Sequence, residues 1–505
     1  MKRVNLIFSI ITLSFFYLTM NTSCTKQTNN GIFDNVTNVG NPALKGEATF
    51  NAENGEYILK GAGENIWGDT DKFFFLSKKI GGDFILRSRV AFVGEGVNAH
   101  RKIGIMARNS FDGNSAHATA VVHGDGLTSL QFRKNEAGIT QEKKSEDNAP
   151  DVVQIERKGN LFIMSTAKNG LPFTTVAVDS IPLNDSLNIG LFICSHETDV
   201  TEKATFNNVR LIKPADDDFV PYQDYIGSHI EILDVESGDR KIVHSSPLSL
   251  QAPNWSPDGK SLMYNSEGKI FDFNIAFSEI KEINTGFAQN NNNDHVLSFD
   301  GKMLGISDHT QHDDNQSLVY ILPATGGKPG LITSEAPSYL HGFSPDGKKI
   351  VYTAGRGDFE HLDIYKADLD TKEETRITDA PGLDDGSEYS PDGKYIYFNS
   401  SRTGTMQIWR MKPDGSQQEQ LTFDEYNDWF PHVSPDGKKL VFVSYSKEID
   451  AEDHPFYKHV YIRTMPADGG KPEVCAYVYG GQGSMNVFNW SPDSRKIAFV
   501  SNSKL

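Results

Sequence analysis

Short runs rich in Ile, Val, Tyr and Phe, separated by turn residues, extend through most of this chain. Runs such as 349–353 and 439–444 show the period of two that is typical of a half-buried β-strand. The separators are chiefly Pro-Asp-Gly, Asp-Gly, Asn-Gly and Gly-Gly. Proline presets φ, aspartate bonds the local backbone and glycine accepts positive φ, so each of these is a turn signal. The pattern therefore predicts an all-β chain.

One turn recurs throughout the second half of the chain. Ser-Pro-Asp-Gly-Lys begins at positions 256, 344, 390 and 434, and variants begin at 298 and 491. The aspartates of these six turns are 42, 46, 46, 44 and 57 residues apart, a spacing that fits the blades of a propeller. A third strand, a second Asp-Gly turn and an outer strand follow within the repeat, which makes a four-stranded antiparallel meander. Six turns predict six blades.

The two ends of the repeat region predict how the ring closes. The last repeat ends after its two inner strands, whereas an unpaired outer pair is expected at 229–234 and 240–243. Pairing these segments leaves no open sheet edge. The repeat, together with Ser-x-Arg-x-Gly at 400–404, resembles the TolB-like six-bladed β-propeller over residues 222–505. Propellers serve as enzymes, binding modules and scaffolds alike, so the resemblance implies the fold rather than an activity.

The first half of the chain has no such repeat and is expected to form a jelly-roll or concanavalin-like β-sandwich over residues 32–212. Gly-Asp-Phe at 82–84, the segment 102–108 and His-Gly-Asp-Gly at 123–126 resemble the concanavalin-like modules of carbohydrate-active and envelope proteins. The resemblance implies sugar binding. The polar and aromatic platform is expected to consist of Trp67, Arg108, His123, Gln131 and Arg133. Alternatively, Arg108 and Arg133 lie on a solvated sheet face. The strands are expected at 56–59, 72–76, 83–92, 102–108, 118–123, 129–133, 152–158, 161–167, 188–194 and 204–211.

A proline and an acidic run over 213–221 predict a linker between the two domains. Charge then limits the partners of the whole chain. Its 505 residues include 49 Lys and Arg against 67 Asp and Glu, a net charge of -18. Nucleic-acid binding needs clustered basic residues, so nucleic acid is excluded as a partner, and anionic membrane surfaces are disfavoured for the same reason.

The N-terminus has the three parts of a secretory signal. A basic head at 1–3 precedes an apolar run at 4–20, and small residues lead to Cys24. This segment resembles the lipobox of bacterial lipoproteins, although Asn21 stands where an aliphatic residue is usual. The resemblance implies a signal peptide at 1–24, a lipid on Cys24 and a tether at 25–31, in a Bacteroidetes-type envelope lipoprotein that is periplasmic or associated with the outer membrane. An ordinary signal peptide with an incidental cysteine is the alternative. Cys194 and Cys475 are each expected to be a buried free thiol.

The residues just before each turn are the candidate site, because the inner strands of a propeller line its central channel. Scaffolding positions should look alike from blade to blade, but here three histidines and a glutamate occur in four successive repeats. Acids and amides lie close to them in the sequence. The residues that we expect at the channel are Asn254, Asp294, His295, His341, Asp384, Asp385, Glu388, Asp428, His432, Gln482 and Asn489.

Two chemistries fit these residues. His295, His341 and His432 are of the right type to bind one divalent metal ion through neutral imidazoles, with Glu388 or Gln482 as an oxygen ligand. Such a site is similar to the manganese site of propeller oligogalacturonate lyases. Alternatively, His432 and Glu388 act as a general base and acid on a glycan. In a purely structural interpretation, each histidine caps a turn or bonds a neighbouring blade.

Other residues are expected to be less informative. Arg356 and Arg402 occupy the same turn position in adjacent repeats and should be structural. The long step before the last repeat is due mostly to residues 448–459, a lid or only an insertion. The histidines expected in loops are His309, His312, His454 and His459.

Two functions are therefore expected. In the first, an envelope lipoprotein binds oligosaccharide at the propeller channel and processes it as a lyase or hydrolase, with the sandwich as an accessory module. In the second, the propeller is a non-enzymatic docking or transport scaffold for an envelope protein, and its acidic surface steers a basic partner.

Overall fold

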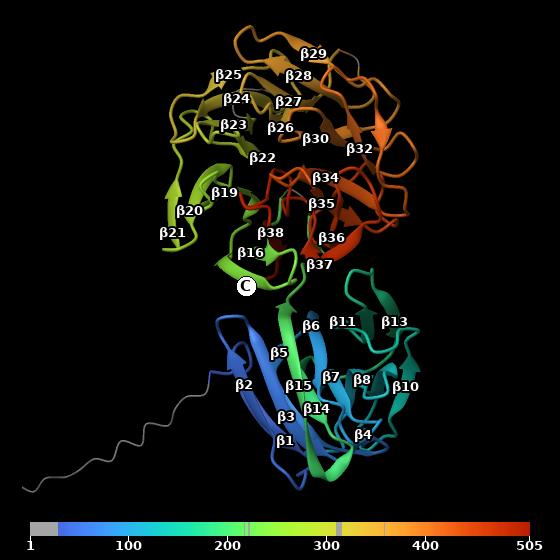
Figure 1. The fold of residues 1–505 in the computed structure, drawn as a ribbon. Helices are drawn as coiled ribbons and strands as arrows, with labels where there is room; N and C mark the ends of the chain where they lie inside the picture. Colours follow the sequence, from blue (N-terminus) through green and yellow to red (C-terminus); the bar gives the residue numbers. More distant parts are fainter. Residues whose placement is uncertain (1–28, 217, 221–222, 310–315, 358, 505) are drawn as a thin grey trace, which may run out of the picture.

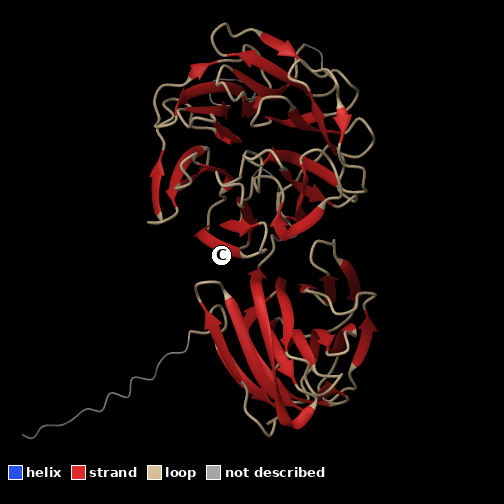
Figure 2. Cartoon of the chain, in the orientation of Figure 1, coloured by secondary structure: helices blue, strands red, loops and turns tan. Residues whose placement is uncertain are grey.

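The structure is a computed structural model that describes residues 29–216, 218–220, 223–309, 316–357 and 359–504. The expected signal peptide, Cys24, the first part of the tether and His312 lie outside these residues. Every regular element of the described chain is a β-strand (Figures 1 and 2), so the all-β prediction is confirmed. The described part contains no helix long and apolar enough to cross a membrane.

The first half of the chain forms two sheets, shown in blue to green at the bottom of Figure 1. Each predicted strand of this half overlaps an observed one. The eight-stranded sheet has the order β1 (Asn35–Val39), β5 (Thr70–Gly81), β14 (Ser186–Cys194), β7 (Lys102–Arg108), β8 (His117–His123), β9 (Thr128–Arg133) and β10 (Gln141–Lys144), with β4 (Asn65–Trp67) paired to β5. The seven-stranded sheet has the order β13 (Thr174–Val178), β12 (Leu161–Ala167), β11 (Val152–Lys158), β6 (Phe84–Val93), β15 (Glu197–Ile212), β3 (Glu56–Gly63) and β2 (Glu47–Asn51).

One apolar core joins these two sheets. Leu76 and Ile105 of the eight-stranded sheet belong to the same buried cluster as Leu59 and Leu86 of the seven-stranded sheet. Cys194 and Cys475 are both free thiols, as predicted. Cys194 is buried as expected, whereas Cys475 is partly exposed. The jelly-roll or concanavalin-like assignment of this two-sheet unit stays a prediction.

The second half forms the six blades that the repeat predicts, arranged as a ring at the top of Figure 1. Five blades are four-stranded antiparallel meanders. The first three are β18 (Gln251–Trp255), β19 (Ser261–Ser266), β20 (Lys269–Asn274) and β21 (Glu279–Glu282); β22 (Asn291–Leu297), β23 (Met303–Asp308), β24 (Leu318–Pro323) and β25 (Gly330–Leu331); and β26 (Ser338–Phe343), β27 (Lys349–Ala354), β28 (Asp363–Asp368) and β29 (Glu374–Arg376). The next two are β30 (Asp384–Tyr389), β31 (Ile396–Ser400), β32 (Gln407–Met411) and β33 (Glu419–Gln420); and β34 (Asn427–Val433), β35 (Lys439–Tyr445), β36 (Lys458–Pro466) and β37 (Glu473–Gly480).

The sixth blade closes the ring from both ends of the propeller. Its three strands have the order β17 (Arg240–Ser246), β16 (Ser228–Asp234) and β38 (Lys496–Asn502). Strand β38 pairs antiparallel with β16 along its whole length, so the predicted closure is confirmed. The inner strand of this blade is reduced to a single bridge between Trp490 and Ile497.

The recurring turn owes its sequence to one hydrogen-bond pattern. In every repeat the serine Oγ donates to the Oδ1 atom of the aspartate two residues on, at 2.5 to 2.8 Å. The same Oγ accepts the backbone N–H five residues on, as in the 3.0 Å bond from Ser261 to Ser256. The residue after the aspartate is at positive φ, for example 72° at Gly259, which glycine adopts without strain. The turn is therefore structural.

Every complete blade also has a register irregularity between its inner strand and the next one. The irregularity lies near residues 251–254, 291–295, 340–342, 385–388 and 429–432. Such a bulge adds a residue to one strand and turns its neighbouring side chains in new directions. Distance from the turn along the sequence therefore does not determine which side chains face the channel.

The two halves of the chain contact each other closely. Phe173 stacks on Tyr477 with ring centroids 4.2 Å apart, and Arg210 of β15 donates to Glu231 of β16 at 2.6 Å. His459 lies in strand β36 and not in a loop as expected, and its Nε2 atom is 2.9 Å from Glu156 of β11. The predicted linker packs against the propeller as well, since the Ala215 N–H donates to Tyr479.

Candidate functional site

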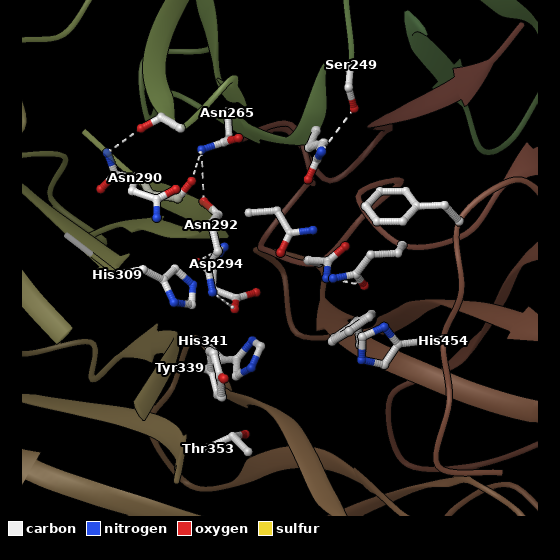
Figure 3. Close-up of a pocket in the computed structure, with 18 of the residues that line it drawn as sticks. Ser249, Asn265, Asn290, Asn292, Asp294, His309, Tyr339, His341, Thr353 and His454 are labelled. Carbon is white, nitrogen blue, oxygen red and sulfur yellow. Dashed lines mark hydrogen bonds between the residues drawn. The ribbon is translucent and has the colours of Figure 1, made fainter. Parts of the chain in front are cut away.

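A cavity of about 860 Å³ lies where the inner strands of the propeller begin (Figure 3). Aromatic side chains on its wall include Tyr225, Tyr339, Phe430 and Phe456. No lysine or arginine is among the described residues that line it. The largest lining group is amides: Gln251, Asn265, Asn290, Asn291, Asn292, Asn293, Gln482 and Asn486.

A buried ion pair stands on the wall of this cavity. His341 Nε2 is 2.9 Å from Asp385 Oδ1, and Asp385 Oδ1 also accepts the Thr353 hydroxyl at 2.6 Å and the Gly386 N–H at 2.8 Å. Burial alone lowers the pKa of His341, but Asp385 and Asp294 raise it to about 9. Burial raises the pKa of Asp385, yet His341 holds it at about 2. The pair is therefore an imidazolium and a carboxylate at neutral pH.

Asp294 is the second buried carboxylate on the wall. Its Oδ2 accepts a hydrogen bond from Asn292 at 2.8 Å, and its backbone N–H donates to Asn292 Oδ1 at 2.9 Å. Burial raises the pKa of Asp294 to about 6, and the nearby charge of Asp385 adds to that effect while His341 opposes it. A carboxyl group with such a pKa is suited to accept or donate a proton near neutrality.

Two further histidines line the cavity. Both lie in loops as predicted, but the sequence analysis did not expect them at the site. His454 comes from the insertion at 448–459, and its ring packs against Trp429 and Phe430 with centroids 4.4 and 5.4 Å away. Burial lowers its pKa, so the ring is neutral. His309 lies opposite it in Figure 3. The length of the insertion was the one sequence signal that pointed to His454.

His432 and Glu388, the expected catalytic pair, do not line this cavity. They contact each other through His432 Nδ1 and Glu388 Oε2 at 2.7 Å, while His432 Nε2 donates to the Met485 carbonyl at 3.0 Å. The second oxygen of Glu388 accepts the Val433 N–H at 3.0 Å. Both ring nitrogens have hydrogen-bond partners, so neither is free to contact a metal or a substrate.

The bond from Glu388 to the next blade recurs elsewhere in the ring. Asn254 stands two residues before its turn, as Glu388 does, and its Oδ1 accepts the Leu297 N–H at 2.9 Å. Both acceptors thus connect one inner strand to the backbone of the next. Asn489, at the same position of the last repeat, donates to the Ala498 carbonyl at 3.0 Å. Glu388 and Asn254 therefore connect neighbouring blades, whereas Asn489 bonds within the last blade.

The remaining expected residues are also engaged away from the cavity. His295 is fully buried, does not line it, and has a pKa that burial lowers to about 4. Asp384 pairs with Arg402 at 2.8 Å, and Asp428 pairs with Arg463 at 2.5 Å. The structure therefore brings only Asp294, His341, Asp385 and Gln482 of the expected set to one cavity.

This placement does not assemble the metal ligands that the sequence suggested. Of the three expected histidines only His341 reaches the cavity, and its Nε2 is committed to Asp385. No group of three or more His, Cys, Asp or Glu in the described residues is arranged to hold a metal ion. A divalent metal stays a prediction without a ligand set.

A smaller pocket of about 220 Å³ lies at the other end of the inner strands, beside the recurring turns. His341 lines both the pocket and the cavity, so it stands between the two ends of the channel. The walls of the pocket are mainly apolar. They include Trp255, Pro257, Phe299, Pro391, Pro435 and Pro492.

The sugar platform expected in the first half of the chain is not assembled. Arg108 is fully buried, donates to the Ser110 carbonyl at 2.6 Å and lies 3.5 Å from Asp71. Arg133 is also buried and pairs with Asp71 at 2.7 Å, so neither arginine lies on a solvated face. Trp67 is exposed, whereas His123 is buried and contacts Gln131 at 3.3 Å.

Comparison with known proteins covers mainly the propeller. A family model described as TolB beta propeller domain matches residues 334–458. An uncharacterized protein of Agrobacterium fabrum is 48% identical over 274 residues, which are 54% of this chain and 92% of that protein. A solved structure from Agrobacterium tumefaciens, provisionally named a TolB, is 46% identical and covers 56% of this chain and all of its own, with a TM-score of 0.53.

A more distant relative is the Tol-Pal system protein TolB of Alcanivorax borkumensis. It is 30% identical over 108 residues, which are 21% of this chain and 24% of that protein. The chain therefore belongs to the family of the uncharacterized Agrobacterium protein, and its second half is a TolB-like PD40 propeller with six blades.

Proposed function

We propose that this chain is a binding protein of the bacterial cell envelope that takes up an oligosaccharide in the cavity of its propeller. The observation that carries the proposal is the cavity itself, whose volume of about 860 Å³ is within the range of small-molecule sites. The envelope location is supported by the Tol-Pal relative. A lipid on Cys24 would attach the chain to a membrane there.

The chemistry of the cavity wall supports a sugar. Amide side chains both donate and accept hydrogen bonds, as sugar hydroxyls do, and many of them converge on this space. The rings of Tyr225, Tyr339, Phe430 and Phe456 offer flat apolar surfaces. A ligand with hydroxyls around its edge and apolar C–H faces matches both features.

Processing of the bound sugar would depend on Asp294 and His341, and not on the expected pair His432 and Glu388. Asp294 has the shifted pKa of a proton-transfer group. The protonated His341 would stabilise negative charge that develops on a substrate. The proposal names these groups as the acid–base candidates of a lyase or hydrolase and assigns no bond to be cleaved.

The test is calorimetry of the full chain against a panel of neutral and charged oligosaccharides. Wild type is expected to bind at least one of them, and His341→Ala and Asp385→Asn should each weaken that binding by about tenfold or more, or roughly 1.4 kcal/mol. Glu282→Gln is the matched control, because Glu282 is an exposed acid on the outer strand β21. Binding that neither cavity variant changes would contradict the proposal.

A second function, protein docking, is favoured by the apolar pocket beside the turns. Phe299 is 41% exposed at this pocket, and an apolar surface at a channel mouth suits an inserted side chain of a partner. Recovery of a stoichiometric envelope protein by wild type but not by Phe299→Ser, without any sugar binding, would favour this function over the first.

A further inference from the structure

Asp294 is a deeply buried acid on the wall of the cavity. Its side chain lines the cavity, yet the residue is only 7% exposed. Its carboxylate accepts a hydrogen bond from Asn292, which is a neutral amide. Within the described residues no Lys, Arg or His lies close enough to Asp294 for an ion pair.

Five other buried carboxylates of the described chain are paired with arginine. The distances between the paired nitrogen and oxygen atoms are 2.5 to 2.8 Å in these cases. Pairing offsets the free-energy cost of removing a carboxylate from water. The paired acids are Asp71, Glu202, Glu231, Asp384 and Asp428, with Arg133, Arg101, Arg210, Arg402 and Arg463 respectively.

Acidic groups outnumber positively charged groups around Asp294 in the described part of the cavity. Among the described residues, His341 is the cation whose charge acts on Asp294, and that imidazolium is already bonded to Asp385 at 2.9 Å. Glu267 and Glu452 add two more acids to the lining. One imidazolium therefore faces several carboxylates, and the electrostatic potential inside the cavity favours a cation.

We propose that the ligand of this cavity carries an ammonium group that pairs with Asp294, so that the sugar is an amino sugar with a free amine. This inference rests on the proposed function, because it takes the cavity to be the oligosaccharide site. An ammonium group supplies both the charge that Asp294 lacks and donors for the surrounding amide oxygens. An acidic sugar would instead meet like charges.

The test compares two ligands that differ only at the nitrogen. Calorimetry of the full chain at about neutral pH measures the binding of a glucosamine oligomer and of its fully N-acetylated counterpart. We expect wild type to bind the glucosamine oligomer at least tenfold more tightly. Asp294→Asn should remove that preference, and Glu282→Gln should keep it. The wild-type comparison holds even if Asp294→Asn does not fold.

Each outcome separates this inference from the proposed function. Equal binding of the two oligomers, or tighter binding of the N-acetylated one, overturns the inference that the ligand carries a free amine. The same result still supports sugar binding. If neither oligomer binds, spermidine is the next probe. If spermidine binds and Asp294→Asn abolishes that binding, the result supports a cationic ligand and contradicts the inference that this ligand is an amino sugar. Failure of all three probes to bind overturns the inferred ammonium group, whereas the proposed function is overturned only if the whole oligosaccharide panel also fails to bind.

Discussion

At the scale of single residues, two buried pairs of a histidine and a carboxylate can be compared by what lies beside them. His432 and Glu388 use their polar atoms on each other and on the backbone. Asp385 and His341 form a similar pair but line an open cavity. The two pairs therefore differ in the space beside them, since Glu388 lines the smaller pocket of about 220 Å³ and His341 and Asp385 line the cavity of about 860 Å³.

The pair of His341 and Asp385 predicts a dependence of stability on pH. His341 has a pKa of about 9 against an ordinary 6.5, so its stabilisation is complete below pH 6.5 and is lost as the pH rises through about 9. Asp385 has a pKa of about 2 against an ordinary 3.8, so its contribution is present above pH 3.8 and is lost as the pH falls through about 2.

Urea denaturation followed by tryptophan fluorescence checks the alkaline side. Between pH 6.5 and 9 the free energy of unfolding of wild type should fall more than that of Asp385→Asn, by on the order of 1–3 kcal/mol. Other titrating groups are common to both proteins, so the difference between the two curves isolates the pair. Parallel curves would disprove the coupling.

At the scale of elements, the bulge on each inner strand determines which side chains of a blade face the channel. Residues before the bulge, such as Asp385, face the cavity, whereas residues after it, such as Glu388, reach the next blade. The acceptors of Glu388 and Asn254 satisfy backbone N–H groups that would otherwise be buried without a partner.

This arrangement predicts that Glu388 stabilises the ring and takes no part in ligand binding. Glu388→Ala leaves His432 and the Val433 N–H without their acceptor and should lower the free energy of unfolding by about 3–5 kcal/mol. Asn254→Ala, at the equivalent position, removes a neutral partner and should cost about 1–3 kcal/mol. Thermal unfolding measures the stability of both variants, and calorimetry measures their ligand binding. If Glu388→Ala kept its stability but lost ligand binding, Glu388 would have a role in the site and not in the ring.

At the scale of the whole molecule, one buried acid connects the two halves of the chain to the closure of the ring. Glu231 of β16 is bonded to Arg210 of the first half at 2.6 Å, to Arg240 at 2.8 Å and to the Ser501 hydroxyl of β38 at 2.6 Å. These contacts join the first and last strands of the propeller to the strand that leads into it.

Glu231→Ala should therefore weaken both the contact between the two halves of the chain and the closure of the propeller ring. Two arginines would remain without their acid, and the free energy of unfolding should fall by about 3–5 kcal/mol. Limited proteolysis should show faster cleavage between residues 213 and 246 than in wild type. Asp234→Ala, which breaks a more exposed pair with Arg495 on the same strand, is the control and should leave cleavage nearly unchanged.

The sequence by itself determined the strands, the six blades and the closure of the ring. Each depends on local signals, since Ser256 and its equivalents build the same turn wherever they occur, and the period of the turn counts the blades. The candidate site was predicted only in part. His341, Asp385 and Asp294 were among the expected residues, but so were His432 and Glu388.

Only the tertiary structure decided between these groups. A bulge of one or two residues redirects neighbouring side chains, and the sequence carries no separate mark for it. Burial of Arg108 and Arg133 likewise depends on Asp71, a partner far away in the chain. Strands depend on neighbours in sequence, whereas charge pairing and cavities depend on neighbours in space. For this reason the sequence predicted the fold well and the site only in part.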